Sequence, residues 1–349
     1  MDTDHPWTAL FATFIADMES ITVDLDDNSI RRYTAFFNVY RHQKTIETDL
    51  SEKIYLGTDH KVCRFCGKHS PIVKFRTDAH VIPQSIGNRY LLSYFECDTC
   101  NHFFGNKYEN SLTNFFSHLR PFAGIENKNR RTKSKRVKHK ESKTGFEIFS
   151  SDLGIGLNIR PDNKEVISID HEKRQISLNI TFQPYTPLFV YKMFLKIGLS
   201  MIDESEIRDF EKSFFFLQDN IQNYKLKNYA YCQVLVTAVP GGLLWPNPFA
   251  VLYTKKENSR DSPHPQKVLM FYFSNRIFQI YLAFDKNDEF LIGKTYTVMR
   301  FPTITDKTYN EHFGQNEEYR YDLSSDNIVK DMKEKMSFEF VDGDFFNPS

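Results

Sequence analysis

The stretch DAHVIP, residues 78–83, lies between two cysteine pairs, CRFC at residues 63–66 and CDTC at residues 97–100. Two Cys-x-x-Cys turns about thirty residues apart are typical of a metal site, because each turn directs two thiolates to one side of the chain. Four thiolates fill a tetrahedral site and leave no open position. The spacing therefore favours a structural Zn²⁺ over a catalytic one, with four ligands: Cys63, Cys66, Cys97 and Cys100.

The residues between the cysteine pairs predict a strand, a loop, a second strand and a helix. Residues 75–82 read as the first strand, which Pro83 ends, and residues 85–88 have turn chemistry. Residues 92–97 read as the second strand, and a helix begins near residues 99–101. The cysteines would clamp this unit at both ends.

Three polar side chains are expected to converge within this unit. Alternation along the first strand puts Asp78 and His80 on one face, and Asn101 at the helix start can approach that face. A carboxylate and an amide oxygen suit a hard divalent cation such as Mg²⁺ or Mn²⁺ that keeps several waters. A neutral histidine beside it can act as a general base.

The combination of the cysteine pairs with DAHVIPQSIGN (residues 78–88) and ECDTCNHFFG (residues 96–105) resembles the HNH endonucleases. These are ββα-metal nucleases on a zinc-stapled, treble-clef-like frame, and the resemblance covers about residues 60–118. It implies that His80 is the general base that deprotonates water. It also implies that Asn101 ligates the catalytic metal, as in HNH domains of CRISPR-associated nucleases.

The chain departs from the family pattern just before the base. Many members have a metal-binding His or Asp there, whereas this chain has Ala79, which cannot ligate. The ligand role is therefore transferred to Asp78. Asn88 corresponds best to the middle Asn that braces the loop. Gly105 stands where some relatives have another metal histidine, so a single, water-rich cation is expected.

Two further residues of the helix are candidates for a supporting role. Glu109 lies about 12 Å along the helix from Asn101 at ~1.5 Å per residue, which favours a structural or salt-bridging role over metal ligation. His102 lies on the same helix face as Glu109. It can either contact phosphate or be a solvated surface histidine.

A basic run follows the helix. It has no acidic residue and no apolar periodicity, so it is interpreted as a linker. This linker either binds the DNA backbone or is a solvated loop. The cations of this run are Lys128, Arg130, Arg131, Lys133, Lys135, Arg136, Lys138 and Lys140.

Composition limits the other classes of function. The 349 residues contain 45 Lys plus Arg and 45 Asp plus Glu, so the net charge is zero and a globally basic nucleic-acid binder is excluded. Five cysteines do not suit a disulfide framework in a chain of this length, and thiolate ligands imply a reducing compartment. No signal peptide is recognisable at the N-terminus. The longest apolar stretch, residues 188–202, contains Lys192 and Lys196, so no membrane span and a cytoplasmic location are expected.

The predicted fold class is α+β, with a zinc-stapled ββα-metal module followed by a larger α+β domain that has an antiparallel sheet. A helix with Thr186 as N-cap is expected to run to about residue 202, and a last helix is expected near residues 325–336. The expected division is a helical segment (residues 1–54), the nuclease module (55–125), a basic linker (126–145) and the C-terminal domain (146–349).

The sequence thus predicts a metal-dependent DNA endonuclease with a His base and one divalent cation. The resemblance also implies a context such as restriction or bacterial anti-phage defence. The C-terminal domain would then bind an activating protein or ligand, or a second copy of the chain. Two alternatives stay open: an inactive, zinc-dependent nucleic-acid-binding or adaptor protein, for which Ala79 is the best support, and an RNA nuclease on the same frame.

Overall fold

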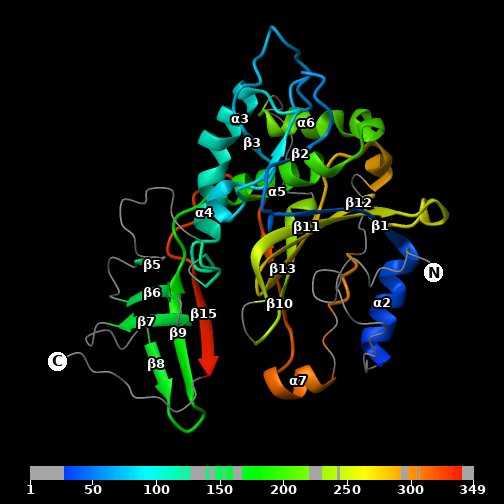
Figure 1. Ribbon diagram of the computed structural model, residues 1–349. Helices are drawn as coiled ribbons and strands as arrows, with labels where there is room; N and C mark the ends of the chain where they lie inside the picture. The colour runs from blue at the N-terminus through cyan, green and yellow to red at the C-terminus, as the bar shows by residue number, and fades with distance from the viewer. Residues whose placement is uncertain are drawn as a thin grey trace.

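A six-stranded antiparallel sheet is the largest sheet in the computed structural model of the protein (Figure 1). Its strand order is β1 (Tyr40–Glu47), β11 (Trp245–Lys255), β12 (Lys267–Ser274), β13 (Arg276–Tyr281), β10 (Gln233–Ala238) and β14 (Glu317–Asp322). The structure describes residues 27–120, 122–125, 139–140, 146–151, 154–159, 167–219, 230–241, 244–291, 298–303, 305 and 307–339.

The two central strands of this sheet are buried on both faces. Every residue of β12 and β13 is buried, and the two strands pair from Val268 with Tyr281 to Phe273 with Arg276. A strand that is covered on both faces reads as a nearly continuous apolar run rather than an alternating one. The sequence VLMFYF of residues 268–273 has this character.

Helix α5 (Pro187–Met201) covers one face of the sheet and separates it from the cysteine module, which we define as residues 55–125 (Figure 1). Phe194 of α5 packs against Phe271 and Phe278 at ring-centroid distances of 5.5 and 5.9 Å. The Tyr191 hydroxyl donates to the carbonyl of Tyr281 at 3.0 Å. Because α5 is buried by the sheet on one side and by the module on the other, almost all of its residues are apolar.

The cysteine module has a small sheet and one long helical run. Strands β2 (Ile54–Leu56) and β4 (Leu91–Ser93) are parallel, and β3 (Ala79–His80) pairs antiparallel with β4. The short helix η1 (Gln84–Ile86) lies between β3 and β4. The helical run comprises α3 (Asp98–Phe104), a π-helical segment η2 (Gly105–Glu109) and α4 (Asn110–Phe115).

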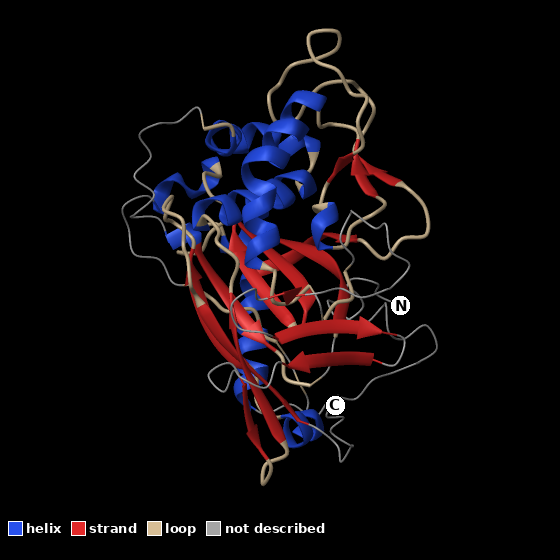
Figure 2. Cartoon of the chain, turned by 90° about the vertical axis from the view of Figure 1, so that its left-hand side faces the viewer, coloured by secondary structure: helices blue, strands red, loops and turns tan. Residues whose placement is uncertain are grey.

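The other elements extend from these two layers, as Figure 2 shows from the side. Two three-stranded antiparallel sheets have the orders β15-β9-β8 and β5-β6-β7. Their strands are β5 (His139–Lys140), β6 (Phe146–Ser151), β7 (Gly154–Ile159), β8 (Ile167–Asp170), β9 (Gln175–Thr181) and β15 (Lys333–Glu339). The remaining helices are α2 (Asp27–Val39), η3 (Glu204–Phe210), α6 (Glu211–Leu217), η5 (Ala230–Cys232), η6 (Glu257–Ser259), η7 (Lys286–Leu291) and α7 (Lys307–Phe313).

The α+β class and the antiparallel sheet are confirmed, and α5 begins after Thr186 as predicted. The strands expected at residues 75–82 and 92–97 are much shorter, because β3 spans only Ala79–His80 and β4 only Leu91–Ser93. Two other expectations are wrong. Residues 40–47, expected to continue the N-terminal helical segment, form β1 at the edge of the main sheet and pair with β11. The structure describes residues 325–336 and shows no helix there. Residues 333–336 belong to strand β15 instead.

Among the described residues, no helix is long and apolar enough to cross a membrane. The basic linker lies outside the described residues except for strand β5, which pairs with β6. Residues 1–26 of the expected helical segment also lie outside them.

Helix α5 approaches the sheet closely at Gly198, which gives a test of this packing. A Cβ at Gly198 would overlap the Leu282 side chain, whose Cδ1 would lie at 3.0 Å. Overpacking costs about 1–3 kcal/mol, which exceeds the roughly 0.5–1 kcal/mol that alanine gains over glycine in a helix. We expect Gly198→Ala to lower the free energy of unfolding by roughly 1 kcal/mol in urea titrations.

Gly105→Ala is the matched control, because a Cβ there meets only the Glu109 carboxylate at 3.9 Å. It should leave stability unchanged or raise it slightly. Equal effects of the two substitutions would contradict the close approach of α5 to Leu282.

Candidate active site

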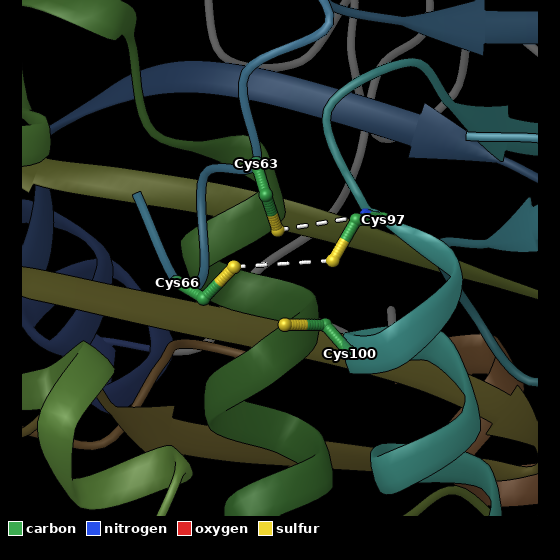
Figure 3. A group of neighbouring side chains, drawn as sticks. All are labelled: Cys63, Cys66, Cys97 and Cys100. Atoms are coloured by element: carbon green, nitrogen blue, oxygen red, sulfur yellow. Dashed lines mark hydrogen bonds between the residues drawn. The ribbon is translucent and has the colours of Figure 1, made fainter. Parts of the chain in front are cut away.

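Four cysteine sulfurs converge at one point of the module (Figure 3). The Sγ atoms of Cys63, Cys66, Cys97 and Cys100 all lie within 4.8 Å of one another, and the Cys66 and Cys97 sulfurs are 3.9 Å apart. Hydrogen bonding by Cys100 lowers the pKa of Cys63 to about 5, although burial opposes the shift. Four converging sulfur ligands fit a tetrahedral Zn²⁺ and leave no open position for a substrate.

The first cysteine turn also docks the module onto α5. Gly67, with φ of +68°, allows the tight turn in which its N–H donates to the Cys63 carbonyl at 2.8 Å. Arg64 projects from this turn and donates from Nη1 to the carbonyls of Leu199, Ser200 and Ile202, each at 3.1 Å. These carbonyls are at the C-terminal end of α5, where helix carbonyls lack partners and attract cations.

The second cysteine pair sets the position of the helix start relative to β3. Asp98, the first residue of α3, accepts hydrogen bonds from the backbone N–H groups of Arg76 at 2.8 Å and Thr77 at 3.1 Å. Asn101, one turn later, donates from Nδ2 to the Thr77 hydroxyl at 3.3 Å. The segment that leads into β3 is therefore held against the first turn of α3, which brings Asp78 and His80 to the same side as Asn101.

These residues open into one pocket of about 340 Å³. A cavity of this size accepts a metal ion with its waters and a phosphate group. The pocket joins the predicted site residues to several others. Its lining is Asp78, His80, Pro83, Gln84, Asn101, His102, Phe104, Gly105, Asn106, Glu109, Met193 and Lys196.

Asp78 is ionised but already engaged. Its carboxylate accepts a hydrogen bond from Lys53 Nζ at 2.6 Å and from the Tyr55 hydroxyl at 3.0 Å. The hydrogen bonds from Lys53 and Tyr55 lower the pKa of Asp78 below its ordinary value, although burial opposes the shift. Its side chain stays 44% exposed, so a cation in the pocket can still reach it.

The residue that departs from the family pattern faces away from the pocket. Ala79 is fully buried, whereas its neighbours Asp78 and His80 both line the pocket. This is the alternation expected of a strand. Strand geometry therefore gives position 78, and not position 79, access to an ion beside the imidazole.

Asn88 is fully buried and braces the loop between β3 and β4. Its Nδ2 donates to the carbonyls of Ile82 at 2.6 Å and Leu91 at 2.8 Å. Its Oδ1 accepts from the N–H groups of Tyr90 at 3.2 Å and Leu91 at 2.8 Å. The side chain thus makes four hydrogen bonds to the backbone on both sides of the loop and acts on the site only through that loop.

Glu109 lies on the pocket wall with Asn101, despite the separation along the helix that favoured a structural role. A side chain on a helix points back toward the N-terminus, and the Glu109 carboxylate lies over Gly105, 3.9 Å from the position of a Cβ there. The intervening turn is π-helical, a distortion often found at functional sites. Within the described part of the chain, Glu109 has no ion-pair partner. His102 also borders the pocket, and its Nε2 lies 2.8 Å from Asn106 Nδ2.

The pocket also includes two residues from outside the module, Met193 and Lys196 of α5, to which the sequence analysis assigned no role in the site. They come from a helix that begins more than eighty residues after Asn101. The sequence contains one indication that these lysines have fixed partners, because Lys192 and Lys196 interrupt an otherwise apolar stretch. A lysine in such a stretch is buried only when it is paired.

Residues 63–117 match a family model described as HNH endonuclease. This segment is therefore similar to HNH endonucleases, and we refer to it as the HNH module. It contains both cysteine pairs, the strand with His80 and the helix with Asn101 and Glu109. No curated protein and no solved structure matches the chain. Helix α5 lies outside the matched residues. So do Lys53 and Tyr55, which donate hydrogen bonds to the Asp78 carboxylate.

The zinc cage is tested by removing one thiol. We expect the wild type to bind about one zinc ion per chain and Cys97→Ser to bind almost none. Apparent binding energies of structural zinc reach ~10–16 kcal/mol in small domains, so the HNH module should also unfold at a lower temperature in the variant. Elemental analysis and differential scanning calorimetry measure the two effects.

Cys232→Ala is the control, since Cys232 is fully buried at the end of η5 and belongs to no cluster of metal-binding residues among those described. It should keep the zinc. Full zinc content in Cys97→Ser would refute a four-cysteine site.

Proposed function

We propose that this protein is a metal-dependent endonuclease that hydrolyses phosphodiester bonds of DNA. The observation that carries the proposal is the pocket of the HNH module, which Asp78, His80 and Asn101 all line. The zinc cage is closed by four thiolates, so hydrolysis is assigned to this pocket and the cage to structure.

His80 is the proposed general base. Its imidazole accepts a proton from the water whose oxygen attacks phosphorus, and the bond between phosphorus and the 3′ oxygen breaks. The backbone of His80 is held in β3 by pairing with Leu92 of β4, and the loop that follows is braced by Asn88. The imidazole of a histidine on such a braced strand keeps a fixed orientation toward the attacking water, as general-base catalysis requires.

Asp78 and Asn101 are the proposed ligands of a divalent cation, Mg²⁺ or Mn²⁺. A bound cation would stabilise negative charge on the phosphate and on the leaving oxygen. The donors fit a hard ion, because one is a carboxylate and the other an amide oxygen. Asn101 Nδ2 donates to the Thr77 hydroxyl, which leaves the amide oxygen Oδ1 to act as the metal ligand. Glu109, which also lines the pocket, is available to bind a water of the hydrated ion.

The basic run is proposed to bind the DNA backbone. It follows the helical run that carries Asn101, and a local cluster of cations binds phosphates even in a chain of zero net charge. A large α+β part attached to an HNH module fits an effector of restriction or anti-phage defence, in which that part senses a trigger. The location that suits such a role is the cytoplasm.

A binding protein without catalysis is the second candidate, and the lack of a ligating side chain at Ala79 favours it. With no ligand at that position and Asp78 held by Lys53, the ion would have few protein donors. This candidate predicts DNA binding that is indifferent to Mg²⁺. An RNA nuclease on the same frame is separated by comparing substrates.

We expect the wild type with Mg²⁺ or Mn²⁺ to nick or linearise plasmid DNA, and His80→Ala to cut it about 10²–10⁴-fold more slowly, because that is the usual contribution of a general base. Initial rates on a gel measure the effect. His102→Ala is the matched control: it removes a histidine from the rim of the same pocket and should keep most of the activity. Zinc content must be equal in all three proteins. Equal rates for wild type and His80→Ala would refute His80 as the base.

The salt dependence of DNA binding tests the proposed role of the basic run. Each lost phosphate contact should reduce the slope of log K against log[salt] by about 0.9 on duplex DNA. We expect replacement of Lys133, Lys135, Arg136 and Lys138 by Gln to flatten the slope and weaken binding, as measured by fluorescence anisotropy. Replacing four exposed or half-buried cations on other elements, Arg31, Lys44, Lys286 and Lys307, is the charge-matched control. Identical slopes for the two sets would contradict the assignment.

A further inference from the structure

Lys196 of α5 makes a direct contact with the backbone of His80. Its Nζ donates to the His80 carbonyl at 2.7 Å. The side chain is only 3% exposed, yet it borders the pocket. A buried ammonium needs fixed partners, and here one of them is the main chain of the proposed base.

The second partner of Lys196 is Glu96, which precedes Cys97 of the zinc cage. The Lys196 ammonium and the Glu96 carboxylate are 2.9 Å apart, and the Glu96 side chain is 1% exposed. The pair therefore connects three parts of the site: α5, the second cysteine turn and β3. Such a pair has one arrangement only, because each member would be left as an uncompensated buried charge if it moved.

Strand β3 needs such a support, because it is only two residues long. It is held on one side by β4, where the Val81 N–H donates to the Leu91 carbonyl at 3.2 Å. The His80 carbonyl also accepts a hydrogen bond from another element. Lys196 supplies the donor from the side of α5.

We propose that Lys196 is a positioning residue of the nuclease site: it fixes the His80 backbone, and so the aim of the imidazole, from a helix outside the matched segment. The proposal rests on the proposed function for its catalytic consequence. It means that the HNH module is completed by the C-terminal part of the chain and that a shift of α5 would misplace the base.

Four proteins test the proposal: wild type, Lys196→Arg, Lys196→Met combined with Glu96→Gln, and Lys192→Met. The Glu96→Gln change is included because Lys196→Met alone leaves a buried carboxylate without its counter-ion. Lys192→Met is the matched control. Lys192 is also 3% exposed and ion-paired, one turn earlier on α5, but its partner is Asp219 and it does not line the pocket.

Cleavage kinetics and hydrogen–deuterium exchange are measured on all four, at equal zinc content. We expect the double variant to lose at least ~10-fold in kcat with KM for DNA within about 2-fold, since a small misplacement of a reacting group lowers the chemical step and not binding. Lys196→Arg, which keeps a charged donor, should recover most of kcat. Exchange in a peptide that covers residues 79–82 should speed up in the double variant and stay unchanged in Lys192→Met.

The exchange readout does not need catalysis, so it separates the two proposals. If the wild type cuts no nucleic acid, the proposed function fails, while faster exchange at residues 79–82 still supports the positioning contact. Unchanged exchange in the double variant overturns the inference, whatever the cleavage rates. So does an equal loss of kcat in Lys192→Met, because the effect would then be general to buried lysines of α5.

Discussion

The convergence of four thiols is the constraint on which the candidate site depends. Cys63 and Cys66 come from one turn, and Cys97 and Cys100 span the start of α3, so one zinc ion would fix the start of that helix against the rest of the HNH module. Asp98 then accepts hydrogen bonds from the backbone N–H groups of Arg76 and Thr77. These bonds hold the segment that leads into the strand with His80 against the start of α3. The module has too small a sheet to achieve this by packing alone.

The second constraint is the docking of this module onto α5. Arg64 binds the carbonyls at the C-terminal end of α5, and Lys196 binds the His80 carbonyl. Buried charges cost free energy unless they are paired, so these contacts specify one arrangement of the two parts more than they stabilise it. The module and the large sheet therefore act as one structure with α5 between them.

Local sequence patterns predicted the elements whose signals are local. Thr186 before Pro187 marked the start of α5. Residues 40–47 and 325–336 were misjudged, because β1 and β15 are specified by partners far along the chain: β1 pairs with β11, and β15 with β9. Pairing of this kind overrides the weak preference of a short polar segment.

The sequence by itself determined the convergence of the four cysteines, a strand that contains His80 and the helix that begins near Asn101, because cysteine spacing and strand alternation are properties of short segments. Only the tertiary structure decided that Glu109 turns back over Gly105 into the pocket and that Asp78 is held by Lys53 and Tyr55. Only it brought Lys196 to His80. These contacts join segments that are separated in sequence or by a distorted helix turn, and their geometry is set by packing around α5, which no local pattern encodes.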